Sequence, residues 1–249
     1  MRRFNYASTT IISKCGNPVE GVPEGSKIVE LPNAGRNDHS FAYYITNLLD
    51  TVLAESNSDK DNSVVFFLKD NANKSNGWVH EIINMVEFAA SDIGFACGTP
   101  GPQGYSAYAD YDVLSSFSSP GYVQRYEVEG AKNAGFKSEY DNLRHWHTSL
   151  GVAPREELVQ ACFEGRFSAS VSQIKKVEDG VWRKIEEDLR RGDNIEEGHF
   201  AERTWGMLLS APLNLYQTEI LKDFSFKISD FGGKLGVLCR DYTLQGCGQ

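Results

Sequence analysis

The residue types that acid–base chemistry needs are densest between Asn194 and Arg203, a run with three carboxylates, one imidazole and one guanidinium. A general base must be a carboxylate or an imidazole held near a reacting hydroxyl group. We therefore interpret Glu196, Glu197 and His199 as candidate catalytic residues. The run also fits a plainer role as an acid-capped helix start facing solvent, because carboxylates stabilise the positive end of a helix dipole.

A second polar stretch, residues 32–38 with the sequence Pro-Asn-Ala-Gly-Arg-Asn-Asp, lies between a predicted strand and a predicted helix. The free N–H groups and the positive dipole end of such a helix attract anions such as phosphate, and Arg36 adds a full charge beside them. Asp70 follows the next predicted strand, where it can hold a divalent metal ion or a sugar hydroxyl. Alternatively, the Asn and Asp residues only turn the chain and cap the helix.

These polar residues are positioned by a predicted unit of strand, helix and strand. Residues 27–31 and 63–68 are short apolar runs typical of strands. The order predicts a right-handed parallel crossover, which brings the first loop and the end of the second strand to one sheet edge, where open α/β folds bind ligands. The helix between them has the apolar i, i+3, i+4 stripe of a helix laid on a sheet. This stripe consists of Phe41, Tyr44, Ile45, Leu48, Leu49, Val52 and Leu53.

From Pro154 onward the sequence predicts mostly helical structure. Helices are expected over residues 178–191 and 199–209, and a short one near 156–161. Residues 163–170 predict a strand, whose glycine indicates that another group approaches the backbone closely. The tail after residue 210 predicts little beyond a terminal hairpin. Two i, i+4 ion pairs are expected in the first of these helices, Glu186 with Arg190 and Glu187 with Arg191.

Length and composition predict one α/β domain over residues 1–249, with a poorly defined start over 1–26 and a C-terminal extension over 210–249. The formal net charge of -9 argues against a general nucleic-acid binder, because phosphate backbones need clustered Lys and Arg. No long apolar run follows the basic first residues. We therefore expect no signal peptide, no membrane span and a cytoplasmic protein.

Cysteine and histidine spacing gives a weaker indication of chemistry. The five cysteines form an odd set without a Cys-x-x-Cys pair, which favours free thiols over a disulfide framework or a zinc site. His145 and His147 would share one side of an extended segment, and this spacing is suitable for metal ligands. With Asp70 they would make a metal-dependent hydrolase, whereas without a third ligand they are structural or surface residues.

Three stretches together resemble a family of fungal and algal proteins of unknown function. They are the loop Leu31–Arg36, the strand Val64–Leu68, and the segment Cys162–Ser170 with the later Glu202-Arg-Thr-Trp205. That pattern is similar to nucleotide-sugar glycosyltransferases of the GT-A type. The resemblance implies a Rossmann-like, mainly parallel sheet flanked by helices, with a helical C-terminal part and without the usual first strand and helix.

The resemblance also implies roles for particular residues. Asp70 would hold manganese or magnesium, although Lys69-Asp70-Asn71 has one carboxylate instead of the Asp-x-Asp pair. Glu196 or Glu197 would be the base that deprotonates the acceptor, with His199 nearby. The residues that would bind the nucleotide sugar are Asn33, Gly35, Arg36, Asn37, Asn71 and Arg203.

The function that follows from this resemblance is sugar transfer from a nucleotide-sugar donor to an acceptor that carries a hydroxyl group. In that reaction a carboxylate takes the acceptor proton, while a cation neutralises the departing diphosphate. The alternative is a non-catalytic carbohydrate- or protein-binding domain on the same fold. An enzyme requires its base and its metal ligand to converge on one site, whereas a binding domain needs only an aromatic-lined surface.

Overall fold

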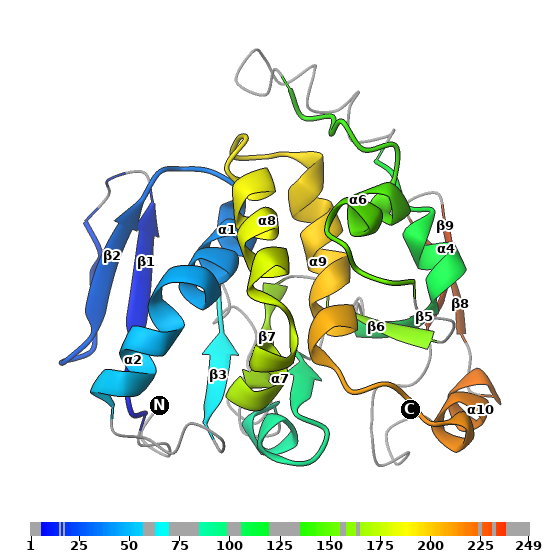
Figure 1. The fold of residues 1–249 in the computed structure, drawn as a ribbon, viewed down its shortest axis with the longest axis horizontal. Coiled ribbons are helices and arrows are strands. Elements are labelled where there is room, and N and C mark those ends of the chain that lie inside the picture. The colour runs from blue at the N-terminus through cyan, green and yellow to red at the C-terminus, as the bar shows by residue number, and fades with distance from the viewer. Residues whose placement is uncertain are drawn as a thin grey trace.

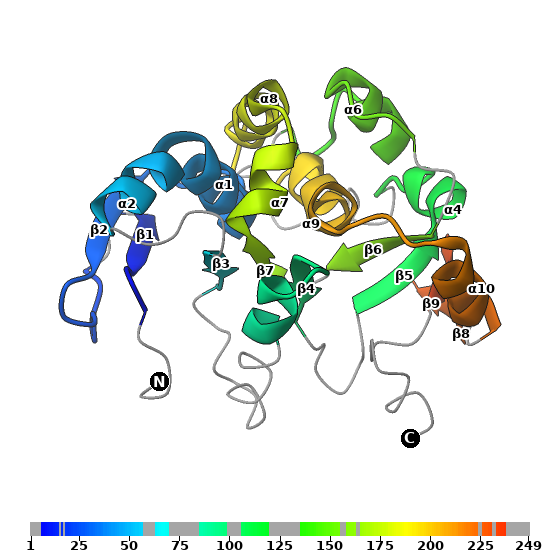
Figure 2. The ribbon, with the colours of Figure 1, turned by 60° about the horizontal axis from the view of Figure 1, so that its bottom comes forward.

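The computed structural model describes residues 6–14, 16, 18–56, 63–69, 85–98, 106–119, 135–154, 158–162, 165–223, 226–230 and 233–237. Within them the chain is a mixed α/β structure with short sheets, arranged as a row of strands with most helices on one side (Figures 1 and 2). No helix in this part of the chain is long and apolar enough to cross a membrane.

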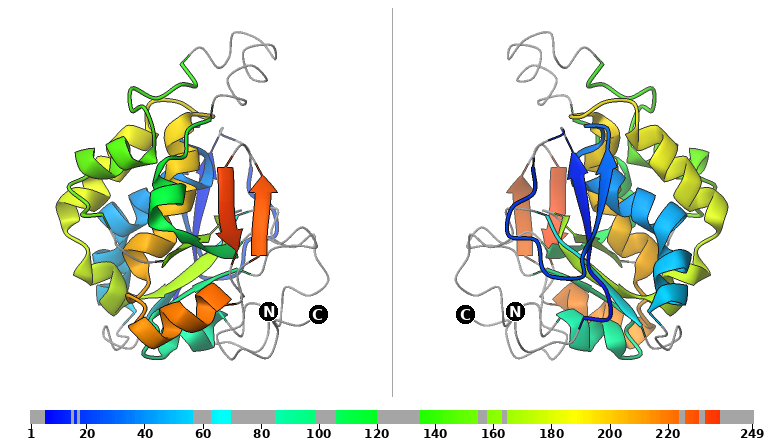
Figure 3. Two further views of the ribbon diagram at one scale, coloured as in Figure 1. Left: turned by 90° about the vertical axis from the view of Figure 1, so that its right-hand side faces the viewer. Right: turned by 90° about the vertical axis from the view of Figure 1, so that its left-hand side faces the viewer.

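The strands form four small sheets. In the first, β1 (Thr10–Lys14) and β2 (Lys27–Leu31) pair in parallel, side by side in the right-hand view of Figure 3. In the second, β7 (Phe167–Ser170) lies between β3 (Val64–Phe67) and β4 (Phe95–Cys97), antiparallel to both. The other two sheets are antiparallel pairs: β5 (Ser106–Asp110) with β6 (Leu158–Cys162), and β8 (Phe226–Asp230) with β9 (Gly233–Val237).

One long helical segment follows β2. It consists of α1 (Arg36–Tyr43), the π-helical η1 (Tyr44–Leu48) and α2 (Leu49–Glu55). Phe41, Ile45 and Leu49 of the predicted apolar stripe are all buried, so this prediction is confirmed. The remaining helices are α4 (Tyr111–Ser115), α6 (Leu143–Ser149), α7 (Val171–Lys176), α8 (Asp179–Leu189), α9 (Glu196–Leu209) and α10 (Leu215–Asp223).

The core lies between α9 and the strands beneath it. Trp205 of α9 is fully buried, and its ring stacks on Phe167 of β7 and on Trp182 of α8. Gly206 allows α9 to lie directly on β6, because a Cβ atom there would be 2.0 Å from the carbonyl oxygen of Gln160. The position of α9 is therefore set by close contact with the sheet.

The predicted parallel crossover from residues 27–31 to 63–68 is wrong in its pairing. Both strands and the helix exist, but β2 pairs with β1, and β3 pairs antiparallel with β7, with Val64 opposite Ser170. The described strands therefore do not form a mainly parallel sheet. An apolar run such as Val64–Phe67 reads the same in either direction, because a strand buried on both faces lacks the alternation that marks an antiparallel strand with one wet face.

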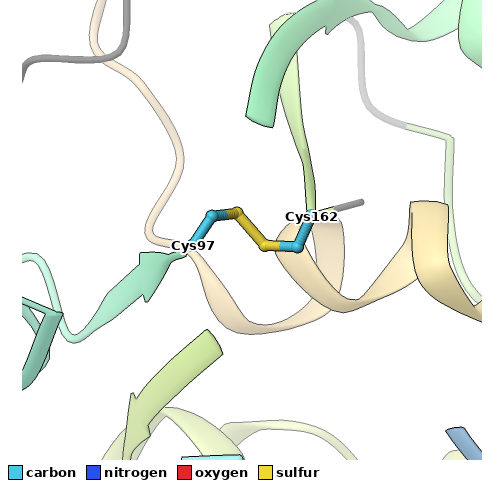
Figure 4. Close-up of a disulfide and its surroundings, with 2 residues drawn as sticks. All are labelled: Cys97 and Cys162. Carbon is cyan, nitrogen blue, oxygen red and sulfur yellow. A yellow bond between two sulfur atoms is a disulfide. The ribbon is translucent and has the colours of Figure 1, made fainter. Parts of the chain in front are cut away.

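Two further local predictions are wrong. Residues 158–162 form the strand β6 instead of a short helix, because cross-strand pairing with β5 outweighs local helical preference. Cys97 and Cys162, expected to be free thiols, form a disulfide that joins the ends of β4 and β6, with 5.3 Å between their Cα atoms (Figure 4). Their separation of 65 residues leaves no local motif that could have indicated this pairing.

Candidate functional site

The turn before α1 has an unusual backbone, and a close contact with the end of α8 accounts for its glycine. Gly35 and Arg36 both have positive φ angles, 55° and 48°. The N–H of Gly35 donates a hydrogen bond to the carbonyl oxygen of Gly192 at 2.6 Å, and a Cβ atom on Gly35 would lie 2.5 Å from the carbonyl oxygen of Leu189. Arg36 lacks the freedom of glycine, so its left-handed conformation is strained, and such strain is concentrated at functional sites.

Lys14, the last residue of β1, holds this turn in place. Its ammonium group donates hydrogen bonds to the carbonyl oxygens of Ala34 and Arg36. Both parallel strands, β1 and β2, end next to this turn, so Gly35 and Arg36 lie at the carboxyl edge of a parallel pair and at the start of α1. The turn thus has the position expected from the sequence, although the parallel partner is a different strand.

Asp38, in the first turn of α1, is 6% exposed. Its Oδ1 accepts a hydrogen bond of 2.7 Å from the indole Nε1 of Trp205 on α9. Burial, followed by the nearby negative charge of Glu202, raises the pKa of Asp38 to about 7. The hydrogen bond from Trp205, the backbone N–H of Asp38 itself and the charge of Lys14 act in the opposite direction. Asp38 therefore gains and loses a proton close to neutral pH.

Three further polar side chains of α9, those of His199, Glu202 and Arg203, interact with one another or act on Asp38. Arg203 donates from Nη1 to the carbonyl oxygen of His199 at 2.9 Å, and the same nitrogen lies 3.6 Å from Oε2 of Glu202. The guanidinium carbon of Arg203 is 3.6 Å from the ring centroid of Phe117. Burial, then the positive charges of Arg203 and Arg36, lower the pKa of His199 to about 4. His199 is thus neutral at physiological pH and close to both guanidinium groups.

These contacts define a charged cluster in which three parts of the chain meet. The end of β1, the start of α1 and the middle of α9 contribute to it. We call it the α1–α9 cluster; its members are Lys14, Arg36, Asp38, His199, Glu202 and Arg203.

Glu196 lies in a buried network of hydrogen bonds and one ion pair, not in an open site. Its side chain is fully buried, and its carboxylate accepts hydrogen bonds from the backbone N–H of Ser119 at 2.8 Å and of Ser138 at 3.0 Å. The ammonium group of Lys137 adds an ion pair at 2.9 Å. Glu196 therefore fastens two distant chain segments to the start of α9. Its predicted catalytic role stays a prediction.

Glu197 is held in the same way. Arg191 donates from Nε and Nη2 to its two carboxylate oxygens, at 2.9 and 2.6 Å. Arg191 also donates to the backbone carbonyl oxygens of Gly135 and Phe136. The ion pair thus also joins the start of α9 to the segment around Gly135 and Phe136, and both carboxylate oxygens of Glu197 accept hydrogen bonds. Its predicted role as a base also stays a prediction.

The other residues predicted to bind ligand have different environments. Asn33 and Arg36 are exposed, and Arg203 is 4% exposed. The side chain of Asn37 packs on Gly165, where a Cβ atom would lie 2.0 Å from Nδ2 of Asn37. This contact is the close approach that the glycine in residues 163–170 predicted.

The predicted metal ligand, Asp70, cannot be compared with the structure. Asp70 and Asn71 lie outside the described residues. In the part of the chain that is described, no three His, Cys, Asp or Glu side chains come together as a metal site. The predictions of manganese or magnesium at Asp70 and of ligand binding by Asn71 therefore stay predictions.

His145 and His147 do not form a pair of metal ligands. They lie on α6, and residues two apart in a helix project about 200° apart, so the two side chains do not share the side that an extended segment would give them. His147 is 1% exposed and hydrogen-bonded to Tyr111 at 3.1 Å and to Thr204 at 2.8 Å. Thr204 donates its own proton to Phe200, so His147 donates from Nε2 and accepts at Nδ1. It is a satisfied core residue.

Sequence reasoning missed Asp38, Trp205 and Lys14 as parts of one site. Asp38 looked like an ordinary helix cap, and Trp205 was only part of the segment Glu202-Arg-Thr-Trp205. Their contact joins positions 167 residues apart, which no local spacing can reveal. The only sequence signal was the acidic residue in a helix start that already carried a glycine and an arginine.

No protein-family model, curated protein or solved structure matches this chain. Its function must therefore be argued from the chemistry of the α1–α9 cluster.

Proposed function

We propose that the chain is a glycosyltransferase-like protein that transfers a sugar from a nucleotide-sugar donor to a hydroxyl acceptor at the α1–α9 cluster. The observation that carries this proposal is that the first turn of α1 holds both Arg36 and Asp38, a buried carboxyl group whose pKa is raised to about 7. The first suits a diphosphate and the second suits proton transfer from a hydroxyl group.

The donor's diphosphate would be bound by Arg36 and by the first N–H groups of α1, since both favour negative charge. Gly35 supports this assignment because it fixes the start of the helix against the end of α8. Arg203 and Lys14 add positive charge to the cluster while holding backbone carbonyl groups. Together they supply the charge that a departing diphosphate needs.

The proposed reaction breaks one bond and forms one. The acceptor oxygen bonds to the anomeric carbon of the donor, and the bond from that carbon to the phosphate oxygen breaks. Its electron pair leaves with the nucleoside diphosphate, and a carboxylate of the cluster takes the proton of the acceptor hydroxyl group. The step is written with protein groups alone, and manganese or magnesium at Asp70 stays a separate prediction.

The family and fold belong to the same proposal. A GT-A-like arrangement, as in the fungal and algal family that the sequence resembles, is supported by the parallel pair β1 and β2 that leads into α1. It is also supported by β3, which ends three residues before Asp70. β3 lies in a separate sheet, antiparallel to β7, so the proposed arrangement departs from a single mainly parallel sheet.

A binding experiment tests this function directly. The melting temperature of the purified protein is measured with UDP, GDP and their hexose conjugates, with and without manganese. A ligand that binds the folded state raises the melting temperature, and the rise grows with the ratio of the free ligand concentration to its Kd. We expect one nucleotide to stabilise the protein and its hexose conjugate to be hydrolysed or transferred, releasing the nucleoside diphosphate.

A matched pair of variants locates the site. Arg36→Gln removes the charge at the start of α1, and we expect binding to weaken by about 10- to 100-fold, the usual effect of one charge-assisted hydrogen bond. Arg183→Gln removes an exposed arginine on α8, whose side chain is 70% exposed, and should leave binding unchanged. A protein that melts cooperatively and is stabilised by none of these nucleotides would refute the proposed function and favour a non-catalytic binding domain.

A further inference from the structure

The carboxyl group of Asp38 is held more rigidly than any solvent-facing carboxylate of the cluster. Its hydrogen-bond donor, the indole of Trp205, is fully buried and cannot change rotamer without disrupting the core. The indole ring stacks on Trp182 with 6.1 Å between ring centroids and on Phe167 with 5.5 Å. Trp205 therefore fixes one oxygen of Asp38 in space.

The other carboxylates near the cluster have different tasks. Glu196 and Glu197 are saturated by backbone N–H groups and by Lys137 and Arg191. Glu202 is 23% exposed and pairs with Arg203. Among the described residues, Asp38 accepts a side-chain hydrogen bond only at Oδ1. The backbone N–H of Asp38 is the other donor that favours the charged form of this carboxyl group.

We propose that Asp38 is the general base of this site and that Trp205 is the positioning residue that orients its carboxylate. This inference rests on the proposed function. The acceptor hydroxyl proton moves to Oδ2 of Asp38 as the acceptor oxygen bonds to the anomeric carbon, and the diphosphate departs with the electron pair of the broken bond. The proton then passes to solvent when the product leaves.

The charges around Asp38 suit this role. Glu202 on α9 disfavours the charged form, whereas Lys14 at the end of β1 and the N–H of Trp205 favour it. Burial is the largest influence, and it raises the pKa of Asp38 to about 7. A base is most effective when its pKa is close to the working pH, because it is then both ionised and basic.

The first test follows the proton itself and needs no substrate. In carboxyl-detected NMR of the free protein, one carboxyl group should titrate near pH 7, and Asp38→Asn should remove that titration. Trp205→Phe keeps the aromatic stack but removes the donor, so the same titration should move to higher pH. Trp182→Phe is the matched control: its indole donates to the carbonyl oxygen of Ile174, so the titration of Asp38 should not move.

The second test uses the nucleotide hexose that the binding screen identifies. Asp38→Asn should lower kcat by about 10²- to 10⁴-fold, the usual contribution of a general base, with little change in the Kd for the nucleotide. Trp205→Phe should lower kcat and move the acidic limb of its pH profile to higher pH, with KM for the donor unchanged. Trp182→Phe should do neither.

The outcomes separate this inference from the function on which it rests. If Asp38→Asn binds the nucleotide and turns it over at the rate of the natural protein, the base assignment fails while the transferase stands. If no nucleotide binds, both fail. A carboxyl group at position 38 that titrates in the ordinary acidic range would also overturn the inference. Should Trp205→Phe not fold, Asp38→Asn alone decides the question.

Discussion

Reduction of the disulfide between Cys97 and Cys162 should lower the free energy of unfolding substantially. The cross-link joins positions 65 residues apart, and in the chain-entropy model a loop of that size stabilises the folded state by about 4 kcal/mol at 25 °C. A whole domain is usually stable by only about 5–15 kcal/mol. The bond is thus expected to supply a large share of the stability of this fold.

The assay is urea unfolding with and without a phosphine reductant, followed by circular dichroism. The oxidised protein should have the higher midpoint. The slope of free energy against urea should increase on reduction, because the unfolded chain then exposes more surface. The doubly substituted variant Cys97→Ala/Cys162→Ala is the control: its midpoint should not respond to the reductant, which shows that no other cysteine is responsible.

Two results would refute this reasoning. Equal midpoints for the oxidised and reduced protein would mean that the cross-link does not constrain the unfolded chain. A lower midpoint in both the natural protein and the double variant after reduction would assign the effect to other thiols. Counting free thiols in the unfolded protein before each titration confirms that the bond between Cys97 and Cys162 is present at the start.

The remaining predictions concern α9 and the core. Gly206→Ala should destabilise the protein by about 1–3 kcal/mol, because its Cβ atom would lie 2.0 Å from the Gln160 carbonyl oxygen. Gly198 lies on the same helix, but a Cβ atom there would have no neighbour within 4 Å, so Gly198→Ala should stabilise the protein by up to about 1 kcal/mol. The two substitutions should therefore shift the urea midpoint in opposite directions, and shifts in the same direction would contradict the packing argument. Burial, followed by the positive charge of Arg144, lowers the pKa of His147 from its ordinary 6.5 to about 3. The unfolded chain therefore binds this proton more readily than the folded protein, and the free energy of unfolding falls as the pH drops below about 6.5. The loss by pH 5 should be about 2 kcal/mol, and His147→Gln should reduce the slope of unfolding free energy against pH in that range; an unchanged slope would exclude this residue as the cause.

The elements that carry a local period could be predicted from the sequence. The strand over residues 27–31 and the helices of 36–55 and 179–189 form where their apolar patterns indicate. The expected pair of Glu186 with Arg190 is also present. Local sequence was sufficient here, because the partners lie within one or two turns of the same helix.

What could not be predicted depends on contacts between distant segments. Arg191 was expected to pair with Glu187, but α8 ends at Leu189, so Arg191 leaves the helical repeat and reaches Glu197 instead. Glu196 was predicted to be a catalytic base from its residue type and its neighbours in the sequence. Its carboxylate instead accepts hydrogen bonds from the backbone N–H groups of Ser119 and Ser138, which are 77 and 58 residues away. A sequence shows which side chains can carry charge, but it does not show which backbone N–H groups will meet them.

The direction of strand pairing could not be predicted either, because it also depends on contacts between distant segments. An apolar run such as Val64–Phe67 predicts a fully buried strand, but only Phe67 of β3 is buried and the other three residues are partly exposed. Whether its neighbour runs parallel or antiparallel depends on β7, more than 90 residues later, which is separated from it by several elements. The composition of a strand does not encode that choice.

The bond between Trp205 and Asp38 also has a consequence for the order of events during synthesis. It joins residues 167 apart, and chains grow at about 5–20 residues per second, so the carboxyl group emerges from the ribosome roughly 8–30 s before its indole partner. During that interval Asp38 is an ordinary solvated acid, and the aromatic stack lacks its central ring. α9 therefore completes both the core and the proposed acid–base group in one step, and a chain that stops before Trp205 can do neither.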